Sequence, residues 1–317
     1  MILLYHNICE EPLRGAVFGT GLPVSHFGQQ LSWLKRHRRI VRLQDYLKQT
    51  AHGTQSAGNL VALTFDDGLA TTFQRAYPHL KRYEAPATVF VSTAHLNGGD
   101  LLWFSYIEAL CFDRSYQEIE VRGNKLSLSS NSLRRYARYY LVNKARESGN
   151  PQAFSEELSY VYYLSACSLA EFSGMTSEQL SLGNSSELIE WGAHTVNHPL
   201  LDLLSPQEQK EEIIRGKQEL EDISGKSVRY FAYPNGDYNR DTLDLIEAAG
   251  FDAAFATHLR RVSLKPRYEI TRIGIYSTSF FRFWLKAQGL VKPGLGRRIR
   301  KRLKPRKPQR IPVLNSG

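Results

Sequence analysis

The sequence predicts an α/β fold, an irregular (β/α) barrel, on three observations. Apolar, strand-like runs alternate with helical patterns along most of the 317 residues. Polar clusters directly follow several of these runs, as they do at the carboxyl ends of barrel strands. A composition of 42% hydrophobic and 23% charged residues is typical of a chain that buries a core, which excludes wholesale disorder.

The first hundred residues contain the start of the strand–helix alternation. We expect strands at Ile2–Tyr5, Ile40–Leu43, Leu60–Phe65 and Ala87–Ser92, with helices over residues 25–38 and 71–83. Ser25 is a residue type that caps helices, so we expect it at the start of the first helix. This order of elements indicates a parallel sheet.

Residues 100–175 interrupt this alternation. Leu133, Tyr136 and Tyr140 have helical spacing, and Gly123-Asn124 could turn a short hairpin over Glu118–Leu128. We therefore expect a largely helical insertion in a single domain that spans residues 1–285. A lid without chemistry, a wall over the site and a partner surface remain open as its role.

The alternation resumes after the insertion and brings the number of expected strands to about eight. Ser205, Pro206 and Glu208 form a helix-start signature, and Gly225 is expected to end that helix. The remaining strands are expected at Leu188–Ala193, Val228–Ala232, Phe251–Ala256 and Tyr268–Ile275, with a helix at Arg240–Ala249. About eight strands in this order suit a (β/α) barrel.

The positive charge of the chain is concentrated at its end. Ten of the 41 Lys and Arg residues lie between Lys292 and Arg310, which leaves 31 against 31 Asp and Glu elsewhere. We expect residues 286–317 to form a basic, flexible tail. The aromatic run Phe280–Leu285 before it suits an anionic membrane surface, and a purely solvated tail is the alternative. A neutral body argues against nucleic acid as the partner.

The start of the chain shows no secretory signal. Met1–His6 has no basic segment and leads into polar residues, so we expect a cytoplasmic or membrane-apposed protein. An extracytoplasmic location is the alternative if the true start lies upstream. No apolar run reaches the ~20 residues of a membrane span. Three cysteines are too few for a disulfide framework or a Cys-based zinc site.

Four polar clusters follow expected strands and would converge on one rim of a barrel. They are His6, Asp66-Asp67, His194-Thr-Val-Asn-His198 and Tyr233-Pro-Asn-Gly236. Two histidines four residues apart can bind one metal, and a carboxylate from the aspartate pair would complete a two-His, one-carboxylate site. One aspartate can then be a ligand while the other accepts a proton from water. Chemistry alone does not say which aspartate has which role.

Three of these segments resemble a known family. Thr64-Phe-Asp-Asp-Gly68, His194-Thr-Val-Asn-His-Pro199 and Arg229-Tyr-Phe-Ala-Tyr-Pro-Asn-Gly236 resemble, in order, the signature motifs of polysaccharide deacetylases (the NodB-homology domain, carbohydrate esterase family four). The resemblance covers residues 1–98 and 176–276. It implies an irregular (β/α) barrel and metal-dependent removal of N-acetyl groups from amino sugars. Leu3-Leu-Tyr-His6 resembles the start of the circularly permuted branch that includes poly-N-acetylglucosamine deacetylases.

The resemblance also implies residue roles. Asp66 would be the general base, and Asp67, His194 and His198 would hold a divalent metal, zinc by preference with cobalt or nickel as alternatives. Tyr233 would lend its backbone N–H to an oxyanion hole, and Arg229 would hold Asp66 electrostatically.

The family's usual Leu-x-Leu-x-His motif, whose histidine is the general acid, has no match after Phe251. We therefore expect His6, as in the permuted branch, to be the acid rather than His258. Pro234 and Arg272 are expected to line the substrate site. A bond between Arg272 and its own sheet edge is an equal alternative.

The predicted function is therefore metal-dependent removal of N-acetyl groups from amino sugars of a bacterial surface or envelope polysaccharide, or its precursor, with release of acetate. A deformylase or amidase acting on a lipid-linked sugar or another small amide is the second hypothesis. A non-catalytic glycan-binding module is the third, and the intact set of expected metal ligands argues against it.

Overall fold

One parallel sheet forms the centre of the molecule. The computed structural model describes residues 1–10, 21–51, 58–258 and 265–291. Within them, nine strands pair in parallel in the order β12-β11-β10-β9-β6-β5-β1-β13, with β4 beside β5. Their bounds are β1 Ile2–Tyr5, β4 Arg39–Ile40, β5 Leu60–Phe65, β6 Ala87–Val91, β9 Ile189–Ala193, β10 Tyr230–Ala232, β11 Ala253–Ala256, β12 Ile270–Thr271 and β13 Ile273–Gly274. Short strands β2 (Ile8–Cys9) and β3 (Leu22–Pro23) pair separately.

A single segment of chain closes this sheet into a barrel. Ile270 and Thr271 pair with β11, and Ile273 and Gly274 pair with β1 at the other end of the sheet. Arg272 lies at the crossing point, so the strand predicted across Tyr268–Ile275 is split there. The predicted irregular (β/α) barrel is thus confirmed, with its two edges joined through Arg272.

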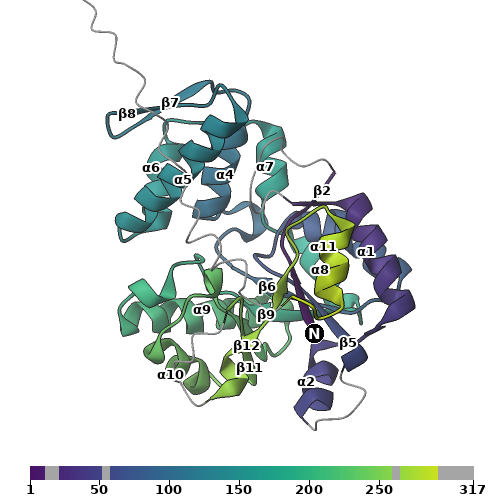
Figure 1. Ribbon diagram of the computed structural model, residues 1–317. Helices are drawn as coiled ribbons and strands as arrows, with labels where there is room; N and C mark the ends of the chain where they lie inside the picture. Colours follow the sequence, from purple (N-terminus) through teal and green to yellow (C-terminus); the bar gives the residue numbers. More distant parts are fainter. Residues whose placement is uncertain (11–20, 52–57, 259–264, 292–317) are drawn as a thin grey trace, which may run out of the picture.

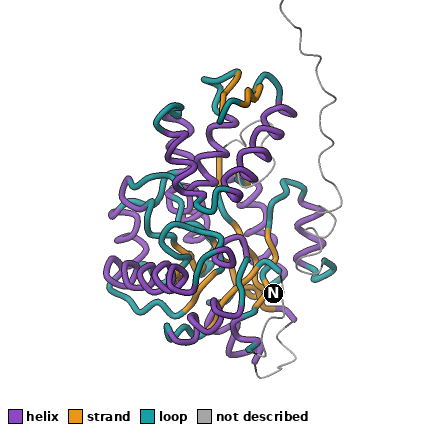
Figure 2. The backbone as a smooth tube through the Cα atoms, turned by 90° about the vertical axis from the view of Figure 1, so that its left-hand side faces the viewer, coloured by secondary structure: helices purple, strands orange, loops and turns teal. Residues whose placement is uncertain are grey.

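Helices surround the strands on the outside of the barrel (Figures 1 and 2). They are α1 Val24–His37, α2 Leu43–Ala51, α3 Tyr77–Arg82 after a π-helical turn at Thr72–Ala76, α8 Ser177–Ser185, α9 Pro206–Ser224, α10 Arg240–Ala248 and α11 Phe280–Ala287. In the described part of the chain, none of the helices is long and apolar enough to cross a bilayer.

The signals predicted for α9 are confirmed. Ser205 and Glu208 form a capping box, Pro206 occupies the first turn, and Gly225 ends the helix with φ +63°. Such a left-handed conformation has no steric cost at glycine.

Three predicted boundaries are wrong. Helix α1 begins at Val24 after Pro23, and Ser25 lies inside it without a capping bond. The strand expected over Ile40–Leu43 ends at Ile40, because Leu43 begins α2 and turns its side chain into the core. The tail boundary at residue 286 falls inside α11, and residues 292–317 lie outside the described residues.

The insertion is helical, as predicted, and has a hydrophobic core of its own. Its elements are α4 Trp103–Phe112, the hairpin β7 Glu118–Val121 with β8 Asn124–Ser127, α5 Asn131–Glu147, α6 Pro151–Ser159 and α7 Ala166–Phe172. It forms the upper lobe in Figure 1. An antiparallel bridge between Leu69 and Gly174 joins it to the loop that follows β5.

Candidate active site

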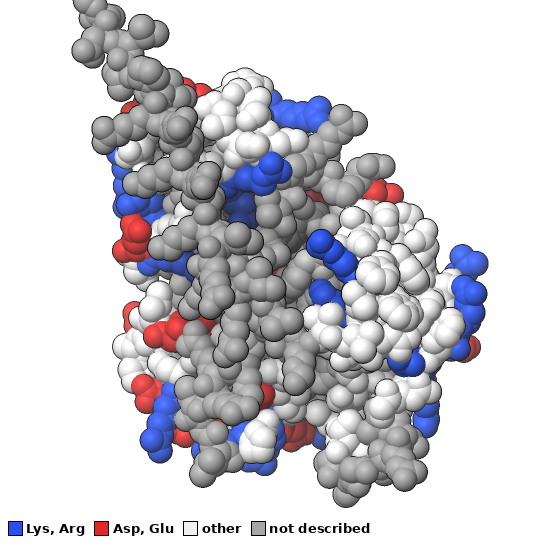
Figure 3. Space-filling view, in the orientation of Figure 1, with Lys and Arg blue, Asp and Glu red and all other residues white. Residues whose placement is uncertain are grey.

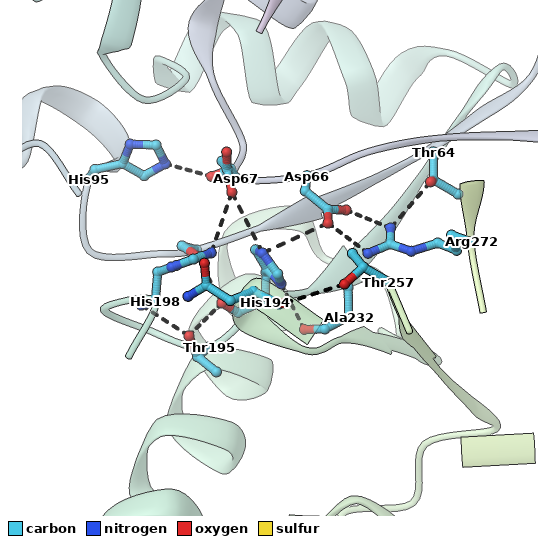
Figure 4. A network of polar contacts seen from close by, with 12 residues as sticks. Thr64, Asp66, Asp67, His95, His194, Thr195, His198, Ala232, Thr257 and Arg272 are labelled. Atoms are coloured by element: carbon cyan, nitrogen blue, oxygen red, sulfur yellow. Dashed lines mark hydrogen bonds and ion pairs between the residues drawn. The ribbon is translucent and has the colours of Figure 1, made fainter. Parts of the chain in front are cut away.

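Three buried side chains converge at the carboxyl ends of β5 and β9 (Figure 4). The Oδ1 atom of Asp67 lies 3.6 Å from Nε2 of His194 and 3.6 Å from Nε2 of His198. One ligand atom from each residue lies within 4.8 Å of the others. Tetrahedral ligands about 2.1 Å from one metal ion lie ~3.4 Å from each other, so this spacing fits a shared metal.

One carboxylate oxygen of this triad also lacks a hydrogen-bond partner among the described residues. This atom is Asp67 Oδ1, and it is buried. A buried carboxylate oxygen left in this way is costly unless a cation satisfies it. Burial and the nearby charge of His194 lower the pKa of His198 to about 3, so its imidazole is neutral near pH 7, as a metal ligand must be. We conclude that Asp67, His194 and His198 fit a divalent metal.

Further hydrogen bonds hold the imidazole of His194 and the backbones of Asp67 and His198. His194 donates from Nδ1 to the carbonyl of Ala232 at 2.7 Å, which leaves Nε2 as the free lone-pair nitrogen. His95 donates from Nε2 to the carbonyl of Asp67 at 2.6 Å, and its burial lowers the pKa of the imidazole and keeps it neutral. The backbone N–H of His198 donates to Thr195 Oγ1 at 3.0 Å.

The backbone around these residues is strained. Asp67, Thr195 and His198 have φ values of +76°, +68° and +53°. Residues with side chains reach this left-handed region only at a cost, and such strain persists where surrounding structure enforces it, often at functional sites.

Helix α9 supplies part of that enforcement. The carboxylate of Glu212 accepts hydrogen bonds from the backbone N–H groups of Val196 and Asn197 at 3.0 and 2.9 Å, and from Asn197 Nδ2 at 2.7 Å. One turn further along α9, Gly216 packs on the Thr195 backbone, where a Cβ would come within 2.7 Å. The turn between the two histidines is therefore held in place by one helix, α9.

The insertion also reaches the triad. Trp103 Nε1, at the start of α4, donates to the carbonyl of His198 at 3.0 Å. The ring of Phe104 lies 4.5 Å from the imidazole of His198. Of the roles left open for the insertion, this contact favours a wall beside the site.

Asp66 has a different environment from its neighbour. Both its oxygens accept hydrogen bonds from Arg272, each at 2.6 Å, and Arg272 also donates to Thr64 Oγ1 at 3.2 Å. Burial alone would raise the pKa of Asp66, but the Arg272 charge and hydrogen bonds, with His194 and His6, lower it below its usual value. Asp66 is therefore a carboxylate at neutral pH, and its Oδ2 lies 4.0 Å from His194 Nε2.

This arrangement agrees with the comparison with known families. The family model described as polysaccharide deacetylase matches residues 53–149 and 166–254, more than half of the chain. The chain belongs to the polysaccharide deacetylase family. The match includes much of residues 100–175, which the sequence motifs had left outside the resemblance.

Individual relatives and structures are similar to this deacetylase to different extents. YxkH of Bacillus subtilis (strain 168), which bears the family's name, is 22% identical over 293 residues, 88% of this chain and 76% of YxkH. A poly-beta-1,6-N-acetyl-D-glucosamine N-deacetylase of Staphylococcus aureus (strain MSSA476) is 37% identical over 73 residues, 23% of this chain and 25% of that protein.

Two solved structures share the fold. The Streptococcus pyogenes deacetylase PplD has a TM-score of 0.58 at 20% identity, with 90% of this chain and 96% of PplD covered. IcaB from Ammonifex degensii has a TM-score of 0.57 at 21% identity, with 90% of this chain and 94% of IcaB covered.

The structure corrects the prediction that Arg229 holds Asp66 in this deacetylase. Arg229 immediately precedes β10 and therefore lies at the amino end of the strands, away from the site. Its Nε donates to Asp252 at 2.6 Å, and 46% of its side chain is exposed. Arg272 is the residue that binds Asp66. Because Arg272 is buried with both terminal nitrogens on Asp66, the prediction that it contacts substrate is wrong, as is the alternative of a bond to its sheet edge alone.

The structure also corrects the prediction for Tyr233. Its backbone N–H donates to the carbonyl of Phe255 at 3.0 Å, because Tyr233 continues the pairing of β10 with β11. Its hydroxyl is buried and donates to the carbonyl of Tyr268. The following residue, Pro234, is buried and has no N–H. The N–H of Asn235 has no partner within the described part of the chain, and Asn235 has φ +56°.

Both candidate acids lie on the carboxyl rim. His6, directly after β1, is half-buried, and its Nδ1 has no partner among the described residues. Its charge contributes to the lowered pKa of both Asp66 and Asp67, which places it within electrostatic reach of the pair. His258, after β11, instead lies 3.8 Å from Asp237. The sequence choice of His6 as the acid stays a prediction.

Proposed function

We propose that this deacetylase hydrolyses N-acetyl groups of amino sugars in a bacterial surface or envelope polysaccharide, or its precursor, and releases acetate. The observation that carries the proposal is the unequal aspartate pair. Asp66 is a buried carboxylate held by Arg272, and beside it Asp67 completes a triad spaced for a metal. The Staphylococcus aureus relative named for poly-beta-1,6-N-acetyl-D-glucosamine supports an N-acetylglucosamine polymer as the substrate.

The proposal includes a divalent metal held by Asp67, His194 and His198. Two imidazoles and one carboxylate suit zinc, and cobalt or nickel accept the same donors. When bound, such a metal supplies Lewis acidity toward the amide carbonyl and toward the attacking water.

The chain's own residues then carry the proton transfers. Asp66 accepts a proton from the water as its oxygen attacks the carbonyl carbon of the acetamide. The Asn235 N–H, in place of that of Tyr233, donates to the oxygen that gains negative charge. His6, protonated, gives a proton to the amide nitrogen as the carbon–nitrogen bond breaks, so acetate and a free amine leave.

The location of the protein stays a prediction. A cytoplasmic or membrane-apposed enzyme would meet a glycan precursor, whereas an extracytoplasmic one would meet the finished polymer. The anionic surface predicted as partner of the basic tail concerns residues outside the described part of the chain.

The test is acyl release from a substrate panel by the metal-loaded protein. We expect acetate from N-acetylglucosamine oligomers and much less formate from their N-formyl analogues. Formate as the main product would instead support the deformylase hypothesis. No release from any substrate, with metal bound, would contradict the proposed substrate class.

A further inference from the structure

Helix α11 exposes an aromatic face. Phe283 and Ala287 of this helix are buried, whereas Phe281 is 65% and Phe280 40% exposed. Tyr276 before the helix and Leu290 after it are 46% and 66% exposed. Together with the half-buried Trp284, which stacks on Phe281, these residues form what we call the α11 face: Tyr276, Phe280, Phe281, Trp284 and Leu290.

The α11 face is firmly attached to the barrel. The Phe283 ring packs edge-on against Trp33 of α1 at 5.9 Å. Arg38 donates to the carbonyl of Ala287 at 3.1 Å and to the side chain of Gln288 at 2.7 Å. Since the inner side of the helix is fixed in this way, its aromatic side is held outward. Figure 3 shows a broad uncharged surface where α11 lies, with Lys and Arg at its margin.

Positive charge lies beside the α11 face. Lys35 and Arg36 lie in the last turn of α1, the helix against which α11 packs, and Arg282 of α11 is itself exposed. Among these, Lys35 has an acidic partner, the exposed Glu84 at 3.6 Å. The sequence then adds ten Lys and Arg residues between Lys292 and Arg310.

We propose that the α11 face is a docking surface for an anionic membrane. Aromatic rings with a basic border are the composition that binds the boundary between lipid headgroups and acyl chains. The Tyr276 ring lies 5.5 Å from that of His6, so a docked protein would hold the rim of its active site at the lipid surface. The inference goes beyond the proposed reaction, because it holds whichever acyl group is removed.

The test is flotation of the full chain with phosphatidylcholine vesicles, with and without phosphatidylglycerol. We expect binding to the anionic vesicles, and about a tenfold weaker partition for the double variant Phe281→Ser, Trp284→Ser. The matched control is Tyr160→Ser, Tyr163→Ser, which removes aromatics that are 79% and 74% exposed on the insertion. The control should float like the unmodified protein.

Three outcomes would overturn the proposal. These are no flotation of the unmodified protein, equal flotation of the α11 double variant, or a dimer in solution that the double variant abolishes, which would assign the face to a second copy. Acetate release from soluble oligomers is measured on the same samples. Unchanged release shows that the variant is folded, and it separates failure of docking from failure of the proposed reaction.

Discussion

At the residue scale, the two neighbouring aspartates differ in their chemistry because they contact different residues. Arg272 binds both oxygens of Asp66, whereas Asp67 Oδ1 has no hydrogen-bond partner among the described residues and faces two histidines. A carboxylate already engaged by a guanidinium is a poor metal ligand but stays ionised and ready to accept a proton. These contacts support the proposal that Asp66 is the base and Asp67 the ligand.

Replacing Arg272 should move the pH profile. In Arg272→Gln, burial would raise the pKa of Asp66 without the opposing charge. A base works when deprotonated, so the acid limb of kcat/KM should shift to higher pH, with activity at pH 6 reduced roughly tenfold or more. Arg272→Lys, which keeps the charge, should shift the limb less. An unchanged profile in Arg272→Gln would contradict the pairing.

The residue types of the site could be predicted from sequence, but not all of their partners. Asp66, Asp67, His194 and His198 each follow a strand, so one rim collects them. Which arginine binds Asp66 depends on how the barrel closes. Arg272 lies between β12 and β13 and binds Asp66, whereas Arg229 binds Asp252. The N–H groups of Tyr233 and Asn235 likewise differ in a way that strand pairing decides: Tyr233 still pairs with Phe255 of β11, whereas Asn235 lies two residues further on, in the turn after β10.

At the element scale, α9 supports the turn that carries His194 and His198. Its Glu212 ties down two backbone N–H groups between the histidines, and its Gly216 permits close approach to Thr195. Contacts behind a ligand commonly set the affinity for the metal.

Glu212→Gln should therefore weaken metal binding. Loss of the carboxylate charge and of one acceptor loosens the turn, and we expect affinity to fall roughly 10- to 100-fold in chelator competition. Glu211→Gln is the matched control, because the exposed Glu211 contacts Arg215 on the same helix. Equal metal affinities for the two variants would show that Glu212 does not support metal binding.

Gly216→Ala should destabilise the fold. A new Cβ would lie 2.7 Å from the Thr195 carbonyl carbon, so the helix or the turn must move. Alanine is the better helix former by about 1 kcal/mol, yet overpacking of about 1–3 kcal/mol should prevail in chemical denaturation. Stabilisation instead would show that α9 does not press on the turn.

Elements with strong local signals could be predicted, and those set by tertiary contacts could not. The capping box and terminal glycine of α9 are local features. By contrast, Ile40–Leu43 is apolar enough for a strand, but Leu43, Tyr46 and Leu47 also have helical spacing and pack on the core as α2. Pairing of β4 reaches just Leu60 and Val61 of β5, so the strand ends early.

At the scale of the whole molecule, the proposed metal site links separate parts of the barrel. The triad joins β5 to β9 across β6, and Trp103 adds the insertion to the same cluster. The motifs predict the barrel, but they cannot place the insertion, whose contact with His198 depends on its own folded core.

Removal of the metal should therefore lower thermal stability. A metal that binds the folded chain at a hundred times its Kd adds about 2.7 kcal/mol, so chelation should lower Tm by several degrees and zinc should restore it. Asp67→Asn should show little response to either addition. If neither chelator nor zinc changed the Tm of the unmodified protein, the proposed metal binding would be contradicted.

The most direct test of the central claim is to measure bound metal and acetate release on one sample of Asp66→Asn. In the proposed reaction Asp66 accepts the proton and Asp67 binds the metal. We therefore expect Asp66→Asn to have the metal content of the unmodified protein and to release no acetate. Loss of the metal together with activity, or retention of activity, would contradict that division.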